Sequence, residues 1–197
     1  SVYELILGKD TVKNVAIELP IKNLSLLPAK SNLVGAEIEL LQTEHKQLSL
    51  KNLLLTASKD YDFVLIDCPP ALGLLTINAL TAATDVIIPV QAEFFALEGM
   101  VQLLSSIHQV KQLFNKQLNL LGVVMTMMQS RTSLSTQVYK ELKDNFGDKL
   151  FKTTIPRNIK LAEAPSHGLP IYLYDRFSKG SSAYKKLYKE VIARVKK

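Results

Sequence analysis

The segment Asp62-Phe63-Val64-Leu65-Ile66-Asp67-Cys68-Pro69-Pro70 has the residue types of a strand that ends in an acidic ligand. Its apolar run predicts a buried strand over Phe63–Asp67, and the two prolines end the ladder because proline has no backbone N–H. At the carboxyl end of that strand, the Asp67 carboxylate could hold Mg²⁺ through water beside a nucleotide phosphate, as in a Walker-B motif. Alternatively, Asp67 only caps a helix that begins near Leu72.

The elements around this segment alternate between short apolar, β-branched runs and longer stretches of helical period. The predicted strands are Leu24–Pro28, Phe63–Asp67, Val86–Val90, Leu120–Met127, Phe151–Ile155 and Ile171–Leu173. Helices are predicted from Leu97 to Ile107, from a cap at Thr132 or Ser133 to a stop at Gly147, and over Ser182–Lys196. The residues of the last helix that are expected to face the core are Tyr184, Leu187, Tyr188, Val191 and Val195. This alternation predicts an α/β fold in a single domain over residues 1–197, with a mostly parallel twisted sheet flanked by helices.

Composition narrows the class of protein. The chain has 197 residues, of which 47% are hydrophobic, so it is long and apolar enough to bury a core. No apolar stretch reaches the roughly 18 residues of a membrane span. Its single cysteine, Cys68, excludes an internal disulfide framework and a multi-cysteine metal site. The net charge of +6 suits a polyanionic partner such as nucleic acid or anionic lipid, or only keeps the chain in solution.

The sequence from Asp67 to Leu80 resembles the Walker-B and switch II segment of the ParA/Soj family of chromosome- or plasmid-partitioning ATPases. Further segments match the family in the same order, and together they are more specific than any one motif. They are Pro28-Ala29, Gly35–Leu40, Pro89–Gln91, Ala96–Gly99, Ile155–Asn158 and Glu163–Gly168. The resemblance covers essentially the whole chain and implies a P-loop NTPase-like fold that uses ATP and Mg²⁺.

The resemblance assigns roles to individual residues. Asp67 would be the catalytic and metal-binding residue. Thr126 and Met127 at one strand end, and Pro156 and Arg157 at the next, would contact the nucleotide base, for which methionine and proline offer apolar surface. Two alternatives remain open, namely that Met127 only fills the core and that Pro156 only ends a strand.

The resemblance also implies partners. The ATP-bound homodimer would bind non-specific DNA through the phosphate contacts of Arg131 and Lys160, and a ParB-like centromere-binding protein would stimulate hydrolysis and release. Such a protein acts in the cytoplasm on the nucleoid, without a membrane. Other lysines could widen the DNA face or only be solvated: Lys152, Lys179, Lys185, Lys186 and Lys189. His167, between Ser166 and Gly168, is interpreted as a residue that orders its loop.

Two other functions are considered. A MinD-like membrane-associated positioning ATPase would add an amphipathic membrane helix after the domain, whereas Ser182–Lys196 is interpreted as the last core helix, which favours partitioning. A non-catalytic remnant that binds DNA or a partner without turnover remains open. A cysteine-ligated iron–sulfur cluster is excluded by the single cysteine.

Family members begin with a strand, a lysine-bearing glycine-rich loop, a helix and a second strand, and none of these is found here. Gly8-Lys9-Asp10 and Lys179-Gly180-Ser181-Ser182 lack the spacing that wraps backbone N–H groups around phosphate. By the resemblance, the chain corresponds to about the C-terminal two-thirds of the family domain, without its first βαβ segment.

The chain by itself is therefore predicted to have no ATPase activity, because the phosphates would lack their main donors. The check is phosphate release by the purified chain with ATP, in Mg²⁺ and in excess chelator. Release that depends on magnesium would contradict the prediction.

Overall fold

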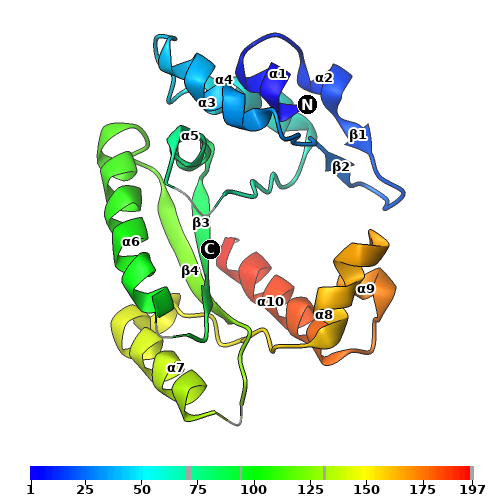
Figure 1. Ribbon diagram of the computed structural model, residues 1–197, viewed down its shortest axis with the longest axis vertical. Helices are drawn as coiled ribbons and strands as arrows, with labels where there is room; N and C mark the ends of the chain where they lie inside the picture. The colour runs from blue at the N-terminus through cyan, green and yellow to red at the C-terminus, as the bar shows by residue number, and fades with distance from the viewer. Residues whose placement is uncertain (70–71, 94, 131, 196–197) are drawn as a thin grey trace. The chain divides into compact units, whose positions relative to one another are not determined.

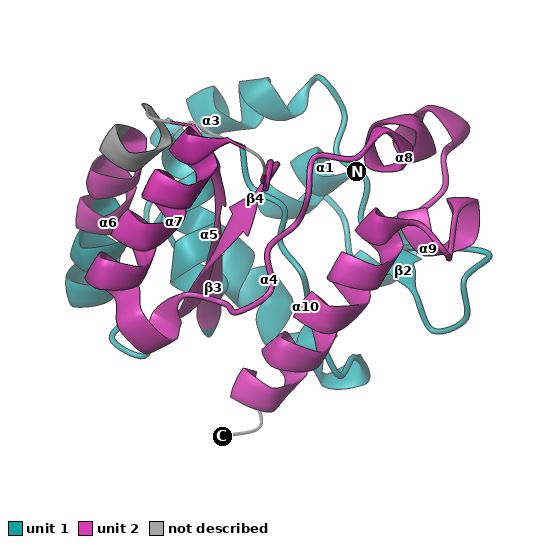
Figure 2. Cartoon of the chain, turned by 90° about the horizontal axis from the view of Figure 1, so that it is seen from below, with its two compact units in different colours: residues 1–84, 106–118 teal, residues 85–105, 119–197 magenta. Residues whose placement is uncertain are grey.

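The computed structural model describes residues 1–69, 72–93, 95–130 and 132–195. The chain divides into two compact units, residues 1–84 with 106–118 and residues 85–105 with 119–197 (Figure 2). Each unit has an apolar core of its own. No helix in these described ranges is long and apolar enough to cross a bilayer.

The second unit is built on a parallel strand pair. Strand β3 (Asp85–Gln91) runs parallel to β4 (Asn119–Thr126), and their last residues, Gln91 and Thr126, lie opposite each other. The continuous apolar run of β4 is buried on both faces, whereas in β3 only Ile88 and Val90 are buried. These two strands confirm the predictions for Val86–Val90 and Leu120–Met127.

A third extended segment runs parallel to β4 along its other edge but is interrupted. The Phe151 N–H donates to the Val123 carbonyl at 2.9 Å, and the Ile155 N–H donates to the Met125 carbonyl at 2.9 Å. In a regular parallel ladder Thr153, not Ile155, would donate to Met125. Instead, the Thr153 N–H donates to the Glu190 carboxylate at 2.9 Å. The predicted strand Phe151–Ile155 is thus a bulged segment and not a regular strand, because Glu190 takes one of its ladder hydrogen bonds.

Helices cover the strand pair from both sides. Helix α7 (Ser133–Phe146) and the first half of α6 (Phe95–Leu113) lie on one side, and α10 (Lys179–Val195) lies on the other (Figure 1). Helix α7 begins after Thr132, whose backbone is extended, and ends at Gly147, whose φ of 48° is left-handed, as predicted from the sequence. Between these ends, Val138 and Leu142 are buried.

The inward face of α10 differs from the prediction. Ala183, Leu187 and Val191, at four-residue steps, pack into the core with Val124, Phe151 and Ile155. Tyr184, Tyr188 and Val195 are exposed instead. The tyrosines directly follow Ala183 and Leu187, so they sit about 100° further round the helix, which keeps the smaller aliphatic side chains toward the core.

The first unit packs helices around Ile6, Ala36 and Leu40. Its elements are α1 (Val2–Ile6), α2 (Val12–Val15), β1 (Ile17–Glu18), β2 (Ser25–Leu26), α3 (Leu33–Leu41), α4 (Ser49–Ala57), the 3₁₀ turn η1 (Ser58–Asp60) and α5 (Leu74–Ala82). Buried Asn115 joins residues 106–118 to this unit, because its Nδ2 donates to the carbonyls of Leu80 and Ala83 at 3.0 and 2.7 Å.

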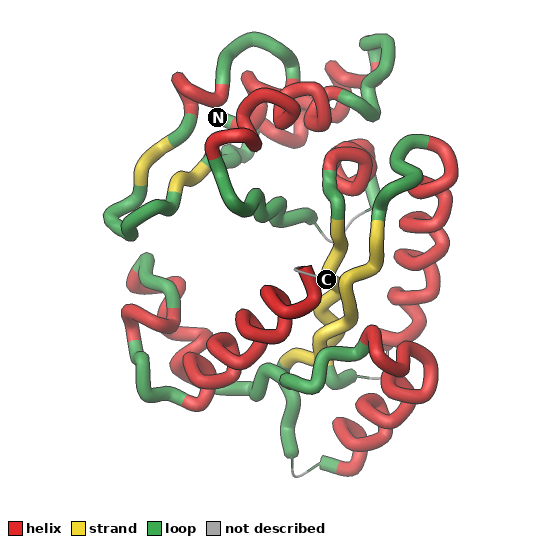
Figure 3. Tube along the Cα trace, turned by 180° about the vertical axis from the view of Figure 1, so that it is seen from behind, coloured by secondary structure: helices red, strands yellow, loops and turns green. Residues whose placement is uncertain are grey.

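Three further strand predictions are wrong in detail. Leu24–Pro28 forms only the two residues of β2, which pairs antiparallel with β1. Phe63–Asp67 lies in a loop and forms no strand (Figure 3), because no described segment supplies the partner that an apolar strand needs; Leu65 is 92% exposed. Ile171–Leu173 is helical, within α9 (Ile171–Tyr174), because the Pro170 carbonyl accepts from the N–H groups of Leu173 and Tyr174, which close this turn.

Arg194, near the C-terminal end of α10, connects this helix to β4 and to residues 149–150. Its guanidinium donates to the carbonyls of Leu121, Lys149 and Leu150 at 2.9 to 3.0 Å and lies 3.9 Å from the centre of the Phe151 ring. Gly122 makes room for it, since a Cβ there would lie 2.4 Å from the Arg194 Nη1 atom.

Arg194→Lys should lower the free energy of unfolding by about 2 kcal/mol, because one ammonium cannot bridge three carbonyls and also stack on the ring. Urea denaturation followed by circular dichroism measures this loss. Lys189→Gln, an exposed change on the same helix, serves as the control and should stay within about 0.5 kcal/mol of the parent. Equal effects of the two substitutions would contradict the role of Arg194.

Candidate functional site

Four of the predicted site residues meet at the carboxyl edge of the strands in the second unit. Thr126 ends β4, where its Oγ1 donates to the Val90 carbonyl at 3.3 Å. Beyond it, Met128 and Pro156 form a parallel bridge, and the Arg157 N–H donates to the Met128 carbonyl at 3.0 Å. These backbone contacts bring Thr126, Met127, Pro156 and Arg157 together. Ligands of parallel α/β sheets bind at such strand ends.

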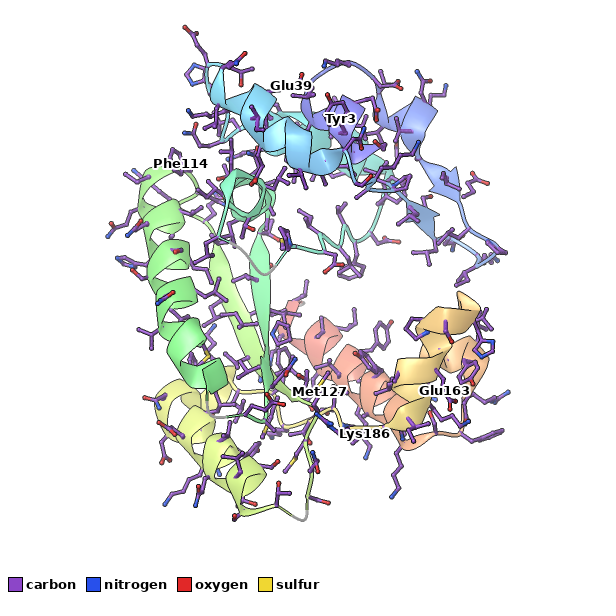
Figure 4. The ribbon with its side chains drawn as sticks, in the orientation of Figure 1. Tyr3, Glu39, Phe114, Met127, Glu163 and Lys186 are labelled. Carbon is purple, nitrogen blue, oxygen red and sulfur yellow. The ribbon has the colours of Figure 1, made fainter. Side chains whose placement is uncertain are left out.

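Met127 has an unusual backbone at this edge. Its φ is 51°, in the left-handed region, and its side chain is 44% exposed at the end of β4 (Figure 4). Met125, two residues earlier, is fully buried and fills the core. The alternative that Met127 is core filler is therefore wrong, and its thioether is available at the surface of the strand edge.

Arg157 extends from the same edge toward an acidic residue. Its Nη2 lies 3.8 Å from Glu93 Oε1, and each side chain is 59% exposed. An ion pair this exposed is weak and exchanges readily. The Arg157 guanidinium is thus positioned beside the strand ends without being committed to a buried partner.

Asp67 lies in the first unit, exposed, on the loop that replaces the predicted strand. Among the described residues, no group of three or more His, Cys, Asp or Glu could hold a metal ion. Partial desolvation and then the Asp67 carboxylate raise the pKa of the Cys68 thiol, so this thiol is a poor nucleophile. The magnesium role of Asp67 stays a prediction.

Of the two predicted DNA-binding residues, Arg131 lies outside the described residues, and Lys160 lies in α8 (Ile159–Glu163). The Asn158 side chain caps this short helix by accepting from the Lys160 N–H at 2.8 Å. The Lys160 Nζ is 2.9 Å from Glu163 Oε2 and 5.7 Å from the centre of the Tyr174 ring. Lys160 is therefore exposed but already paired.

The Glu163 carboxylate is shared between two donors. The Tyr174 hydroxyl donates to the same Oε2 atom, at 2.8 Å. Hydrogen bonds from Lys160 and Tyr174 lower the pKa of Glu163, and its carboxylate in turn raises the pKa of Lys160 and of Tyr174. The charged pair thus persists at neutral pH. Sequence analysis missed this contact, although the three-residue spacing of Lys160 and Glu163 on a helix indicates it.

His167 stacks on Tyr174, a member of this cluster. Its ring lies 4.9 Å from the Tyr174 ring at 26° in the 3₁₀ turn η3 (Ala164–His167), before Gly168 in the left-handed conformation. This packing agrees with the interpretation of His167 as a residue that orders its loop.

A basic cleft of about 490 Å³ opens beside the bulged segment. Its charged rim consists of Lys152, Lys179 and Lys186, the last labelled in Figure 4. The Glu190 carboxylate in the same cleft accepts from the backbone N–H groups of Lys152 and Thr153, each at 2.9 Å. Within the described ranges, none of the three lysines forms an ion pair, so their charges are free for an anionic partner.

Solved structures place this architecture in the class of P-loop NTPase-like α/β proteins. A cobyrinic acid a,c-diamide synthase from Mycobacterium smegmatis, with bound ATP analog and magnesium, superposes on this chain with a TM-score of 0.84 and 35% sequence identity. The match covers 100% of this chain and 72% of the synthase. An ATP complex of McdA from Cyanothece has a TM-score of 0.86 and 20% identity over 99% of this chain and 75% of that chain, which shows the shared fold. The predicted fold class is confirmed.

The family follows from curated relatives. The chromosome-partitioning ATPase Soj of Treponema pallidum is 46% identical over 194 residues, which are 98% of this chain and 77% of the relative. The sporulation initiation inhibitor protein Soj of Bacillus subtilis is 48% identical over 192 residues, 98% of this chain and 76% of the relative. A family model described as an AAA domain matches residues 1–120. The chain belongs to the ParA/Soj family of partitioning ATPases, as its motifs predicted.

Met127→Gly should leave the free energy of unfolding within about 0.5 kcal/mol of the parent, because relief of the left-handed strain offsets the entropy cost of glycine. Met128→Gly is the matched control, since Met128 is half-buried with an ordinary φ, and it should lose about 1 kcal/mol or more. Urea denaturation of both variants makes the comparison. A loss at Met127 as large as at Met128 would contradict this account of the strand end.

Proposed function

We propose that the chain carries the base-binding and DNA-binding parts of an ATP-gated partitioning switch. The observation that carries the proposal is the group at the strand edge: Thr126, Met127, Pro156 and Arg157. Met127 and Pro156 would cover the face of the base, while the backbone around Thr126 and Arg157 would supply hydrogen bonds to its edge. The ATP analog and magnesium in the related M. smegmatis structure support the same ligands here.

Asp67 would hold Mg²⁺ through water, in concert with the phosphate-binding loop typical of the family. A carboxylate is a suitable ligand for this hard cation, and magnesium would neutralise charge on the phosphates during hydrolysis. ATP would join two copies of the protein, and hydrolysis would separate them.

DNA would bind to the basic side chains of the second unit. Non-specific binding depends on phosphate contacts, which mobile lysine and arginine side chains make without reading sequence. Arg131 and Lys160 are the proposed contacts, and the unpaired lysines of the basic cleft support a wider face. A ParB-like centromere-binding protein would trigger release, and the protein would act in the cytoplasm on the nucleoid.

The test is duplex DNA binding by the protein expressed from the complete reading frame of its gene. Binding is measured with ATP, with ADP and without nucleotide, at two salt concentrations. We expect ATP-dependent, salt-sensitive binding that falls at least about tenfold in Arg131→Ala and in Lys160→Ala.

Lys116→Ala, an exposed charge that precedes the amino end of β4, is the control and should bind like the parent. Absence of DNA binding under every nucleotide condition, together with ATP-dependent binding to anionic liposomes, would replace the proposal with a MinD-like function. DNA binding that ignores nucleotide would indicate a non-catalytic remnant.

A further inference from the structure

The Lys160 ammonium forms an ion pair with an acidic side chain of its own helix, Glu163. Glu163 Oε2 lies 2.9 Å from Lys160 Nζ, and the Tyr174 hydroxyl donates to the same oxygen at 2.8 Å. Since Tyr174 is in α9 and Glu163 in α8, the hydroxyl fixes the carboxylate from a second element. The Lys160 side chain is 44% exposed and the Glu163 side chain 39%, so both charges remain accessible to solvent.

We propose that Glu163 is an intramolecular competitor of DNA, whose carboxylate holds the Lys160 ammonium in the place that a DNA phosphate takes in the complex. This inference rests on the proposed function and concerns its regulation. The carboxylate weakens non-specific binding, most strongly at low salt, so that the protein leaves DNA more readily.

Geometry and exposure both support an exchange of partners. A carboxylate and a phosphate offer the same acceptor to an ammonium, and lysine binds either one as a compact point charge on a flexible stem. A surface pair of this exposure is weak and screened by salt, so a polyanion can displace it. Tyr174 keeps a hydrogen bond to the carboxylate when the ammonium leaves, so Glu163 is not left without a partner.

The charges around Lys160 identify Glu163 as the acid that competes with DNA for the Lys160 ammonium. In the described part of the chain, the carboxylate within ion-pair distance of the Lys160 ammonium is that of Glu163, at 2.9 Å. The cleft lysines have no such partner in the described part of the chain. Removal of the Glu163 charge should therefore affect the Lys160 contact and leave the cleft contacts unchanged.

The experiment compares the ATP-dependent DNA affinity of the full-length parent with that of Glu163→Gln. Glutamine keeps an oxygen for the Tyr174 hydroxyl but loses the charge that holds Lys160. We expect about two- to fivefold tighter binding at low salt. The dependence of the logarithm of affinity on the logarithm of salt should steepen by up to about one, because Lys160 then engages a phosphate without a rival.

Three further variants separate this effect from net charge. Glu141→Gln removes the same charge from an exposed position of α7 and should change affinity far less. In the Lys160→Ala background, Glu163→Gln should have no effect of its own, since the contact that it releases is absent. Glu163→Asp keeps the charge but withdraws it by one methylene, so it should tighten binding in the same direction by a smaller factor. Thermal melting checks that each variant is folded.

Several outcomes would overturn the inference alone. The first is that Glu163→Gln binds DNA no more tightly than the parent, although Lys160→Ala weakens binding. The second is that Glu141→Gln tightens binding as much as Glu163→Gln. The third is that Glu163→Gln still tightens binding when Lys160 is replaced by alanine. A parent that binds no DNA with any nucleotide would instead remove the proposed function and this inference together.

Discussion

The candidate site depends on one set of backbone hydrogen bonds, those that β4 makes on both of its edges. On one side β4 pairs with β3, with one register shift between Val86 and Ile87, and on the other its carbonyls accept from the N–H groups of Phe151 and Ile155. Because all three segments run parallel, their carboxyl ends meet at one edge, and the loops that follow them must meet there too. The side chains proposed to hold the base are thus brought together by the ladder and not by contacts among themselves.

Local sequence predicted part of this arrangement well. β3, β4 and α7 follow from continuous apolar runs and from the residues at their ends, such as Thr132 and Gly147. The bulge at Lys152 and Thr153 could not be predicted in this way, because it requires a carboxylate 37 residues later in the chain. The strand prediction for Phe63–Asp67 was wrong for the opposite reason. Its residues have the types typical of a strand, but a strand forms only when another segment pairs with it. Of the candidate site, the four edge residues were predicted through family resemblance, whereas the left-handed Met127 and the Glu163 contacts emerge only in three dimensions.

Both units contain the same combination of side chains. In the first unit, Glu39 accepts from the Tyr3 hydroxyl; both residues are labelled in Figure 4. The Lys9 Nζ lies 2.8 Å from Glu39 and over the Tyr3 ring. In the second unit Glu163, Tyr174 and Lys160 repeat this triangle. In both, a tyrosine hydroxyl and an ammonium share one carboxylate at the surface, which lowers the pKa of the acid. The difference is in context, because Lys160 alone of the two lysines is at a position that the family resemblance assigns to DNA.

The bulge held by Glu190 has a consequence for self-association. An outer strand normally presents unpaired N–H groups that can template another chain and lead to edge-to-edge aggregation. Here the outward N–H of Lys152 donates to the Glu190 carboxylate from α10, which also takes the N–H of Thr153 away from β4. An incoming strand would have to displace this charge and fit a distorted backbone. The helix that covers the sheet therefore also protects this margin of it against pairing with a strand of another copy.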